Sequence, residues 1–200
     1  NGYDIKKLLY TILTSKTYQL PSVSVEDAGS IVAQDYTFKG MLRRRLTAEQ
    51  FADAISVAIE PIYPDSVVVY KLLPENTRNA VSFPRAALVK NDPFLTSLGR
   101  PNRETVSTSR VSQASLLQAL ELTNGRQFNN ALKSAAFKWK EKYPDAGLMI
   151  KEIYRNAFGR LPLADEQKIA MKTLGGHPTV EAIQDFIWAI TIHPEFQLIF

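Results

Sequence analysis

The sequence contains no cysteine. This absence excludes disulfide bonds, thiolate metal ligands, a cysteine nucleophile and the covalent attachment of a c-type haem within the chain. The longest apolar runs, such as the one from Val67 to Tyr70, fall far short of the roughly 20 residues that span a bilayer. We therefore expect no membrane span and no cofactor held by this chain.

Histidine is scarce as well. The chain has two histidines, His177 and His193, and each is followed directly by proline at a predicted helix boundary. A zinc site needs three or four converging ligands at fixed spacing, and the sequence has no HExxH or comparable cluster. We predict that both histidines are structural or face solvent and that the chain holds no metal.

Motifs of common catalytic sites are missing too. The sequence has no GxGxxG, no Walker-type glycine loop and no GxSxG elbow, so it offers neither a phosphate-binding loop nor a serine on a strained turn. The acidic pair Asp165 and Glu166 falls at a predicted helix start, where carboxylates complement the positive end of the helix dipole. We predict no catalytic residue and no enzymatic activity.

The charge balance is mild, with 24 Lys and Arg against 20 Asp and Glu and a net charge of +4 over 200 residues. An excess of this size is not the concentrated positive charge of a nucleic-acid-binding domain. With 45% hydrophobic residues, a chain of this length can bury most of its apolar surface in one core. We expect a single domain over residues 1–200 and no nucleic-acid partner.

Apolar residues recur at helical spacing along most of the chain. Near the N-terminus, Ile5, Leu8 and Leu9 share one helix face, and Asp4 is placed to cap that helix. Thr47 and Gln50 have the spacing of a capping box. The pattern predicts helices over residues 4–18, 47–59, 112–123, 126–142, 146–158, 164–174 and 179–191.

Two local expectations concern the helix at 112–123 and the aromatic residues. We expect Leu116, Leu117 and Leu120 to face inward, and Gly125 to end this helix in a left-handed conformation. The aromatics Trp139, Tyr154, Phe186 and Trp188 lie on helical stripes, which favours a core position over a sugar-stacking platform.

Proline-containing segments separate the predicted helices. A polar loop runs to Gly40, and the segment 61–93 is punctuated by prolines, with Val67 to Tyr70 as its short strand candidate. A connection of this length is unusual inside a compact domain. The sequence therefore predicts a mainly α fold, an irregular multi-helix bundle with long proline-containing loops and at most one short strand pair.

Arginines provide the candidate ligand-binding residues. Planar guanidinium groups suit carboxylates, phosphates and sulfates, which favours an anionic ligand or an acidic glycan. The alternative interpretation is that these arginines tie irregular loops to helix ends and to acidic side chains inside the protein. The residues concerned are Arg43, Arg44, Arg100, Arg103 and Arg110.

Several sequence blocks, taken together, resemble one family. They are Tyr3–Leu9, Thr14–Tyr18, Arg44–Gln50, Leu98–Glu104, Leu116–Leu120, Asn124–Gly125, Arg160–Pro162, Trp188–Ile190 and Pro194–Phe196. In this order they are similar to the C-terminal domain of planctomycete-type secreted multidomain proteins, the domain of unknown function 1553 or PSD family. Where relatives tend to place cysteines before an arginine, this chain has Val106 to Ser109 before Arg110.

The resemblance implies that the chain is the C-terminal module of a larger exported protein, located in the periplasm or outside the cell. It implies upstream domains as partners within the same polypeptide, one of them a cytochrome-c-like domain that would carry haem, with envelope proteins or an acidic glycan as further partners. We expect a non-catalytic structural or interaction module. The alternatives are anionic-ligand binding through the arginine-rich loop, and an accessory domain of a polysaccharide-degrading or electron-transfer enzyme.

Overall fold

The structure, a computed structural model, describes residues 2–23, 38–63, 85–102 and 115–199. Contacts group the chain into two compact units, residues 1–45 with 198–200, and residues 46–197. The predicted mainly α fold is confirmed, since the described residues form helices and one short two-stranded sheet. The prediction of one domain over residues 1–200 stays a prediction, and the strand candidate from Val67 to Tyr70 lies outside the described residues.

The first unit contains one helix and the short sheet. Helix α1 (Ile5–Leu13) begins where the Asp4 carboxylate accepts a hydrogen bond from the backbone N–H of Lys7, and it ends earlier than predicted. Every residue of α1 is exposed, including its apolar stripe. Strand β1 (Arg44–Arg45) pairs antiparallel with strand β2 (Leu198–Ile199).

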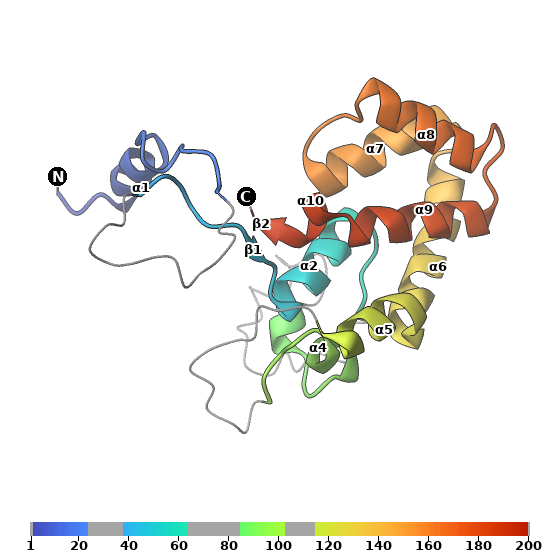
Figure 1. Cartoon of the computed structure of the whole chain (residues 1–200), viewed down its shortest axis with the longest axis horizontal. Coiled ribbons are helices and arrows are strands. Elements are labelled where there is room, and N and C mark those ends of the chain that lie inside the picture. The colour runs from blue at the N-terminus through green and yellow to red at the C-terminus, as the bar shows by residue number, and fades with distance from the viewer. Residues whose placement is uncertain (1, 24–37, 64–84, 103–114, 200) are drawn as a thin grey trace. The chain divides into compact units, whose positions relative to one another are not determined.

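Helices form most of the described part of the second unit (Figure 1). The predicted capping box is present at the start of the first of them, with Gln50 donating its backbone N–H to the Thr47 hydroxyl. The elements are α2 (Ala48–Ala58), the 3-10 helix η4 (Ala86–Leu88), α4 (Pro93–Ser97), α5 (Leu116–Asn124), α6 (Arg126–Lys142), α7 (Ala146–Phe158), α8 (Ala164–Leu174), α9 (Val180–Ile192) and α10 (Pro194–Gln197). No helix among the described residues is long and apolar enough to cross a membrane.

The core of this unit is centred on the packing of α6 against α9, while α7 and α8 lie side by side and α7 also contacts α2 (Figure 1). Phe128 of α6 stacks on Phe94 of α4, with ring centroids 5.9 Å apart. The ring of Phe51 in α2 lies edge-on to Phe196 of α10 at 5.9 Å. These aromatic contacts join elements from both ends of the unit's sequence in one core.

Two expectations for α5 are wrong. Leu116, Leu117 and Leu120 are exposed, and Leu122 is the buried residue of this helix. Periodicity identifies an apolar face but does not show whether that face is covered, and in α5 the residue that lies in the core is Leu122. Gly125 is also not left-handed, because its φ of −61° is an ordinary extended value. At Gly159 the left-handed conformation does occur, with a φ of 68°.

We predict that Gly125→Ala destabilises the protein for a steric reason. An added Cβ would lie 2.3 Å from the backbone oxygen of Glu121, and overpacking of this kind costs about 1 to 3 kcal/mol. Gly176→Ala is the matched control, since a Cβ there meets nothing within 4 Å. Urea unfolding should show the loss only in the first variant, and equal midpoints for the two variants would contradict the prediction.

Candidate functional site

Arg100, the central residue of the predicted arginine site, is buried. Its Nη1 donates to the carbonyl oxygens of Val89 at 3.0 Å and Ala86 at 3.5 Å, and its Nη2 donates to that of Ala87 at 3.4 Å. Its Nε lies 3.5 Å from Oε1 of Glu49. Arg100 therefore ties η4 and the following turn to α2, which is the kind of internal contact that the alternative interpretation describes.

The other predicted arginines lie elsewhere. Arg43 and Arg44 are exposed in the first unit, where the Nε of Arg43 donates to the Ser22 hydroxyl at 3.4 Å. Arg103 and Arg110 lie outside the described residues. Ligand binding through these arginines stays a prediction.

We predict that Arg100→Gln destabilises the fold by about 2 to 4 kcal/mol, because loss of a buried charged donor leaves main-chain carbonyls and a carboxylate poorly compensated. Arg126→Gln serves as the control, since Arg126 is exposed at the start of α6. Thermal and urea unfolding measure both variants. A stable Arg100→Gln protein would refute the assignment of Arg100 as an internal tie.

Sequence reasoning missed two acidic residues that organise the same region. The buried Asp53 of α2 accepts hydrogen bonds from Arg85 Nε and from the backbone N–H of Ala86, both at 2.8 Å. The hydroxyl of the buried Tyr63 donates to Asp92, and burial together with this carboxylate raises the pKa of Tyr63 well above its ordinary value. No local pattern marks these pairs, because their members lie 29 to 33 positions apart.

A second arginine, Arg160, pairs with two carboxylates. Arg160 donates from Nε and Nη2 to Glu195 at 2.8 and 2.7 Å, and from Nη1 and Nη2 to Glu166 at 2.8 Å each. Its guanidinium also lies 5.6 and 5.5 Å from the ring centroids of Tyr154 and Phe158. The cluster joins the α7–α8 connection to α10, and we call it the Arg160 clamp.

The clamp changes the acidity of its carboxylates. Hydrogen bonds from Arg160 lower the pKa of Glu166 to about 2, helped by the backbone N–H of Leu163, which donates to the same side chain at 2.7 Å. Arg160 lowers the pKa of Glu195 as well. The prediction that Glu166 complements a helix start is confirmed by the Leu163 hydrogen bond, and the ion pair with Arg160 adds a second role.

We predict that the clamp stabilises the protein above about pH 4.5 and is lost as the pH falls toward 2, because a carboxylate with a lowered folded-state pKa favours folding only where it is ionised. Glu166 and Arg160 are partly exposed, so solvent screening limits the effect to about 1 kcal/mol. Urea unfolding should show that the stability difference between the wild type and Glu166→Gln is largest near pH 6 and mostly absent near pH 2.

Asp165→Asn is the control for this experiment, since the neighbouring Asp165 makes no ion pair among the described residues. It should change the pH dependence less than half as much as Glu166→Gln. A stability difference for Glu166→Gln that is the same at both pH values would contradict the assignment.

Both histidines are exposed, and the four aromatic residues lie in the core or pack against it. His177 is exposed, and His193 accepts a hydrogen bond at Nδ1 from the backbone N–H of Glu195 while its ring packs on Phe158. In the part of the chain that the structure describes, no group of three or more His, Cys, Asp or Glu is placed to hold a metal ion.

Three of the four aromatics predicted for the core are buried, and the fourth, Trp188, is partly buried.

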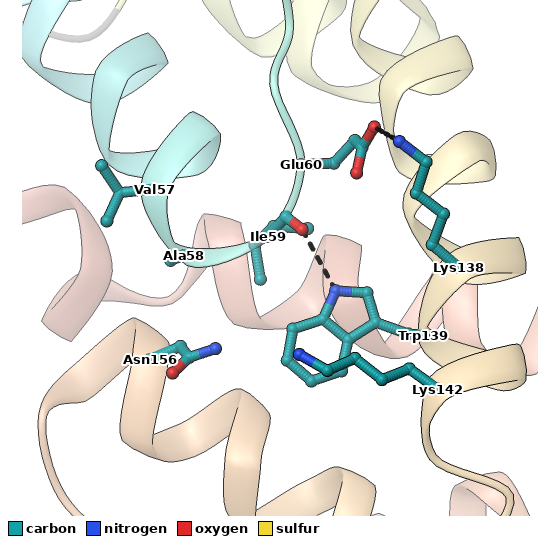
Figure 2. Close-up of a pocket in the computed structure, with 8 residues that line it drawn as sticks. All are labelled: Val57, Ala58, Ile59, Glu60, Lys138, Trp139, Lys142 and Asn156. Atoms are coloured by element: carbon teal, nitrogen blue, oxygen red, sulfur yellow. Dashed lines mark hydrogen bonds and ion pairs between the residues drawn. The ribbon is translucent and has the colours of Figure 1, made fainter. Parts of the chain in front are cut away.

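A pocket of about 260 Å³ lies between α2, α6 and α7 (Figure 2). Trp139 forms part of its wall and donates its indole N–H to the carbonyl oxygen of Ile59 at 3.1 Å. Lys138 forms an ion pair with Glu60 at one side. Lys142, one helical turn after Lys138, shares its face of α6. The remaining lining residues are Val57, Ala58 and Asn156.

A second hollow, of about 360 Å³, adjoins this pocket and shares Val57, Ala58 and Asn156 with it. Its lining also includes Asp53 and Arg85, which are paired with each other. The polar groups of this second hollow are therefore largely engaged with the protein. The pocket between α2, α6 and α7 is the better candidate for a ligand.

Comparison with known proteins gives one family. A model of the family PSD1, described as a protein of unknown function (DUF1553), matches residues 1–174. The matched range includes the blocks from Tyr3 to Pro162, and it ends before α9 and α10. No curated protein and no solved structure matches the chain.

Proposed function

We propose that this chain, which belongs to the PSD1 family of proteins of unknown function (DUF1553), is a non-catalytic structural and interaction module of a secreted bacterial envelope protein. The observation that carries the proposal is the use of Arg100 and Arg160. Both guanidinium groups contact the chain itself, one through main-chain carbonyls and the other through two carboxylates. Such contacts favour a role in holding loops to a helical core.

The Arg160 clamp also explains two of the sequence blocks that carry the family resemblance. Arg160 belongs to the block Arg160–Pro162, and Glu195 belongs to the block Pro194–Phe196. The clamp brings these blocks together, and Phe196 beside Glu195 is buried against Phe51. These contacts account for Arg160, Glu195 and Phe196 without any reaction, which supports a structural role.

Exposed apolar residues support the interaction part of the proposal. In α1, Leu8 is 59% exposed, and in α5, Leu117 is 57% exposed. Large apolar side chains exposed along one helix are typical of surfaces that contact another protein. The family resemblance implies upstream domains in the same polypeptide, and we propose these domains as the partner.

Export and haem belong to the parent protein in this proposal. Because the chain has no cysteine, a covalently attached haem would be carried by an upstream cytochrome-c-like domain, as the resemblance implies. The parent gene provides the direct check, since the proposal requires an N-terminal signal peptide. A parent without one would contradict the extracytoplasmic location.

The interaction is tested by titrating the purified chain with the separately produced upstream region of its parent protein in a calorimeter. We expect a complex that Leu8→Glu and Leu117→Glu weaken about tenfold or more, because each change places a charge in an apolar contact. Ile169→Glu is the control, since Ile169 on α8 is 66% exposed. Absence of a complex, equal losses in all three variants, or turnover by the chain alone would refute the proposal.

A further inference from the structure

Three polar groups of the pocket between α2, α6 and α7 have hydrogen-bonding capacity that the described residues leave unused. The Lys142 ammonium lies 5.0 Å from the centroid of the Tyr143 ring and pairs with no carboxylate in the described ranges. The exposed Asn156 carboxamide makes no hydrogen bond to a described residue. Glu60 receives Lys138 at Oε1, and its Oε2 has no such partner.

These groups line the same pocket. Lys142 extends from α6 and Asn156 from α7, and Figure 2 shows their side chains pointing toward each other across the pocket. Glu60 lies beyond the end of α2 on the side of Lys138. A ligand in the pocket would therefore meet an ammonium group, a carboxamide and a carboxylate oxygen from three different elements.

The charge of the lining selects a monoanion. One carboxylate and two ammonium groups line the pocket, which leaves a net charge of one positive. The pocket also lies at the C-terminal end of α2, where the helix carries partial negative charge that disfavours a dianion such as phosphate. A single carboxylate placed on Lys142 meets both conditions.

The remaining lining determines what accompanies the carboxylate. Asn156 both donates and accepts hydrogen bonds, and the second oxygen of Glu60 accepts them, which suits hydroxyl groups. Val57 and Ala58 supply an apolar wall for carbon atoms. The volume of about 260 Å³ lies just below the roughly 300 to 1,000 Å³ of pockets for drug-sized ligands, so the ligand is small.

We propose that this pocket binds a small hydroxylated carboxylate, about the size of one sugar acid. Its carboxylate pairs with Lys142, and its hydroxyl groups bond to Asn156 and to Glu60. The ion pair with Lys138 holds the Glu60 side chain in position for this contact. The proposal goes beyond the scaffold role and does not depend on Arg100, Arg160 or the exposed faces of α1 and α5.

Calorimetric titration with D-glucuronate tests the proposal, and Trp139 in the pocket wall gives a second readout by fluorescence. We expect saturable binding that D-glucose, which lacks the carboxylate, and acetate, which lacks the hydroxyl groups, reproduce about tenfold more weakly or not at all. The carboxylate and hydroxyl groups could belong to a free sugar acid or to the uronate end of a polysaccharide, and a disaccharide uronate distinguishes the two. Binding as tight as that of glucuronate identifies a polysaccharide end, and weaker binding identifies the free acid.

Matched variants locate the site. Lys142→Met and Asn156→Leu should each weaken glucuronate binding, the first by about tenfold or more, while Lys140→Met on the exposed side of α6 leaves it unchanged. Thermal unfolding must give the same midpoint for all variants. Where a variant fails this check, chemical-shift mapping of glucuronate binding to the wild-type protein locates the site in its place.

The proposal is overturned by absence of saturation up to about 20 mM, by equal binding of glucose, or by wild-type affinity in Lys142→Met. Such a failure leaves the scaffold role standing, because that role rests on the clamp.

Discussion

The second unit depends on the apolar packing of α6 against α9. Ile183 and Ile187 of α9 are fully buried in the cluster that contains Leu132 of α6, and each such side chain contributes about 1.5 to 3 kcal/mol. This packing fixes two helices that carry indole donors. Trp139 of α6 reaches the end of α2, and Trp188 of α9 donates to the carbonyl oxygen of Leu122 in α5 at 2.7 Å. The packing of α6 against α9 therefore sets the positions of α2, α5 and the pocket wall.

Arginine supplements this packing where the chain is irregular. A buried or partly buried guanidinium is stabilising only when its donors are matched, and Arg100 and Arg160 each contact several acceptors from separate segments. Within the described residues, no buried side-chain nitrogen or oxygen lacks a hydrogen-bond partner. Lysine would not replace either arginine, because a point charge cannot reproduce the planar fork. These positions are therefore constrained by geometry as much as by charge.

The sequence predicted local structure well and long-range contacts poorly. The bounds of α6, α7 and α8 agree with prediction, because apolar spacing, caps and stops are local signals. Periodicity could not tell which apolar faces are covered, so the exposure of Leu117 was missed. It also gave no sign of Asp53, whose partner Arg85 lies 32 positions away, or of a pocket in which Glu60 meets Lys138 across 78 positions. The arginine-rich loop was singled out by composition, whereas the pocket arises only when α2, α6 and α7 come together.

The end of the chain shows that a recognisable sequence pattern and a folding unit need not share a boundary. The family match stops at residue 174, yet α9 begins at Val180 and supplies the apolar partner of α6. A fragment cut at the limit of the match would leave that face of α6 bare, and a bare apolar face of this kind promotes aggregation. It would also lack Glu195, so Arg160 would retain one of its two carboxylates. The last helices are thus an integral part of the unit. A substitution in α9 or α10 should be judged by how it changes the apolar volume packed against α6 and the charge that faces Arg160.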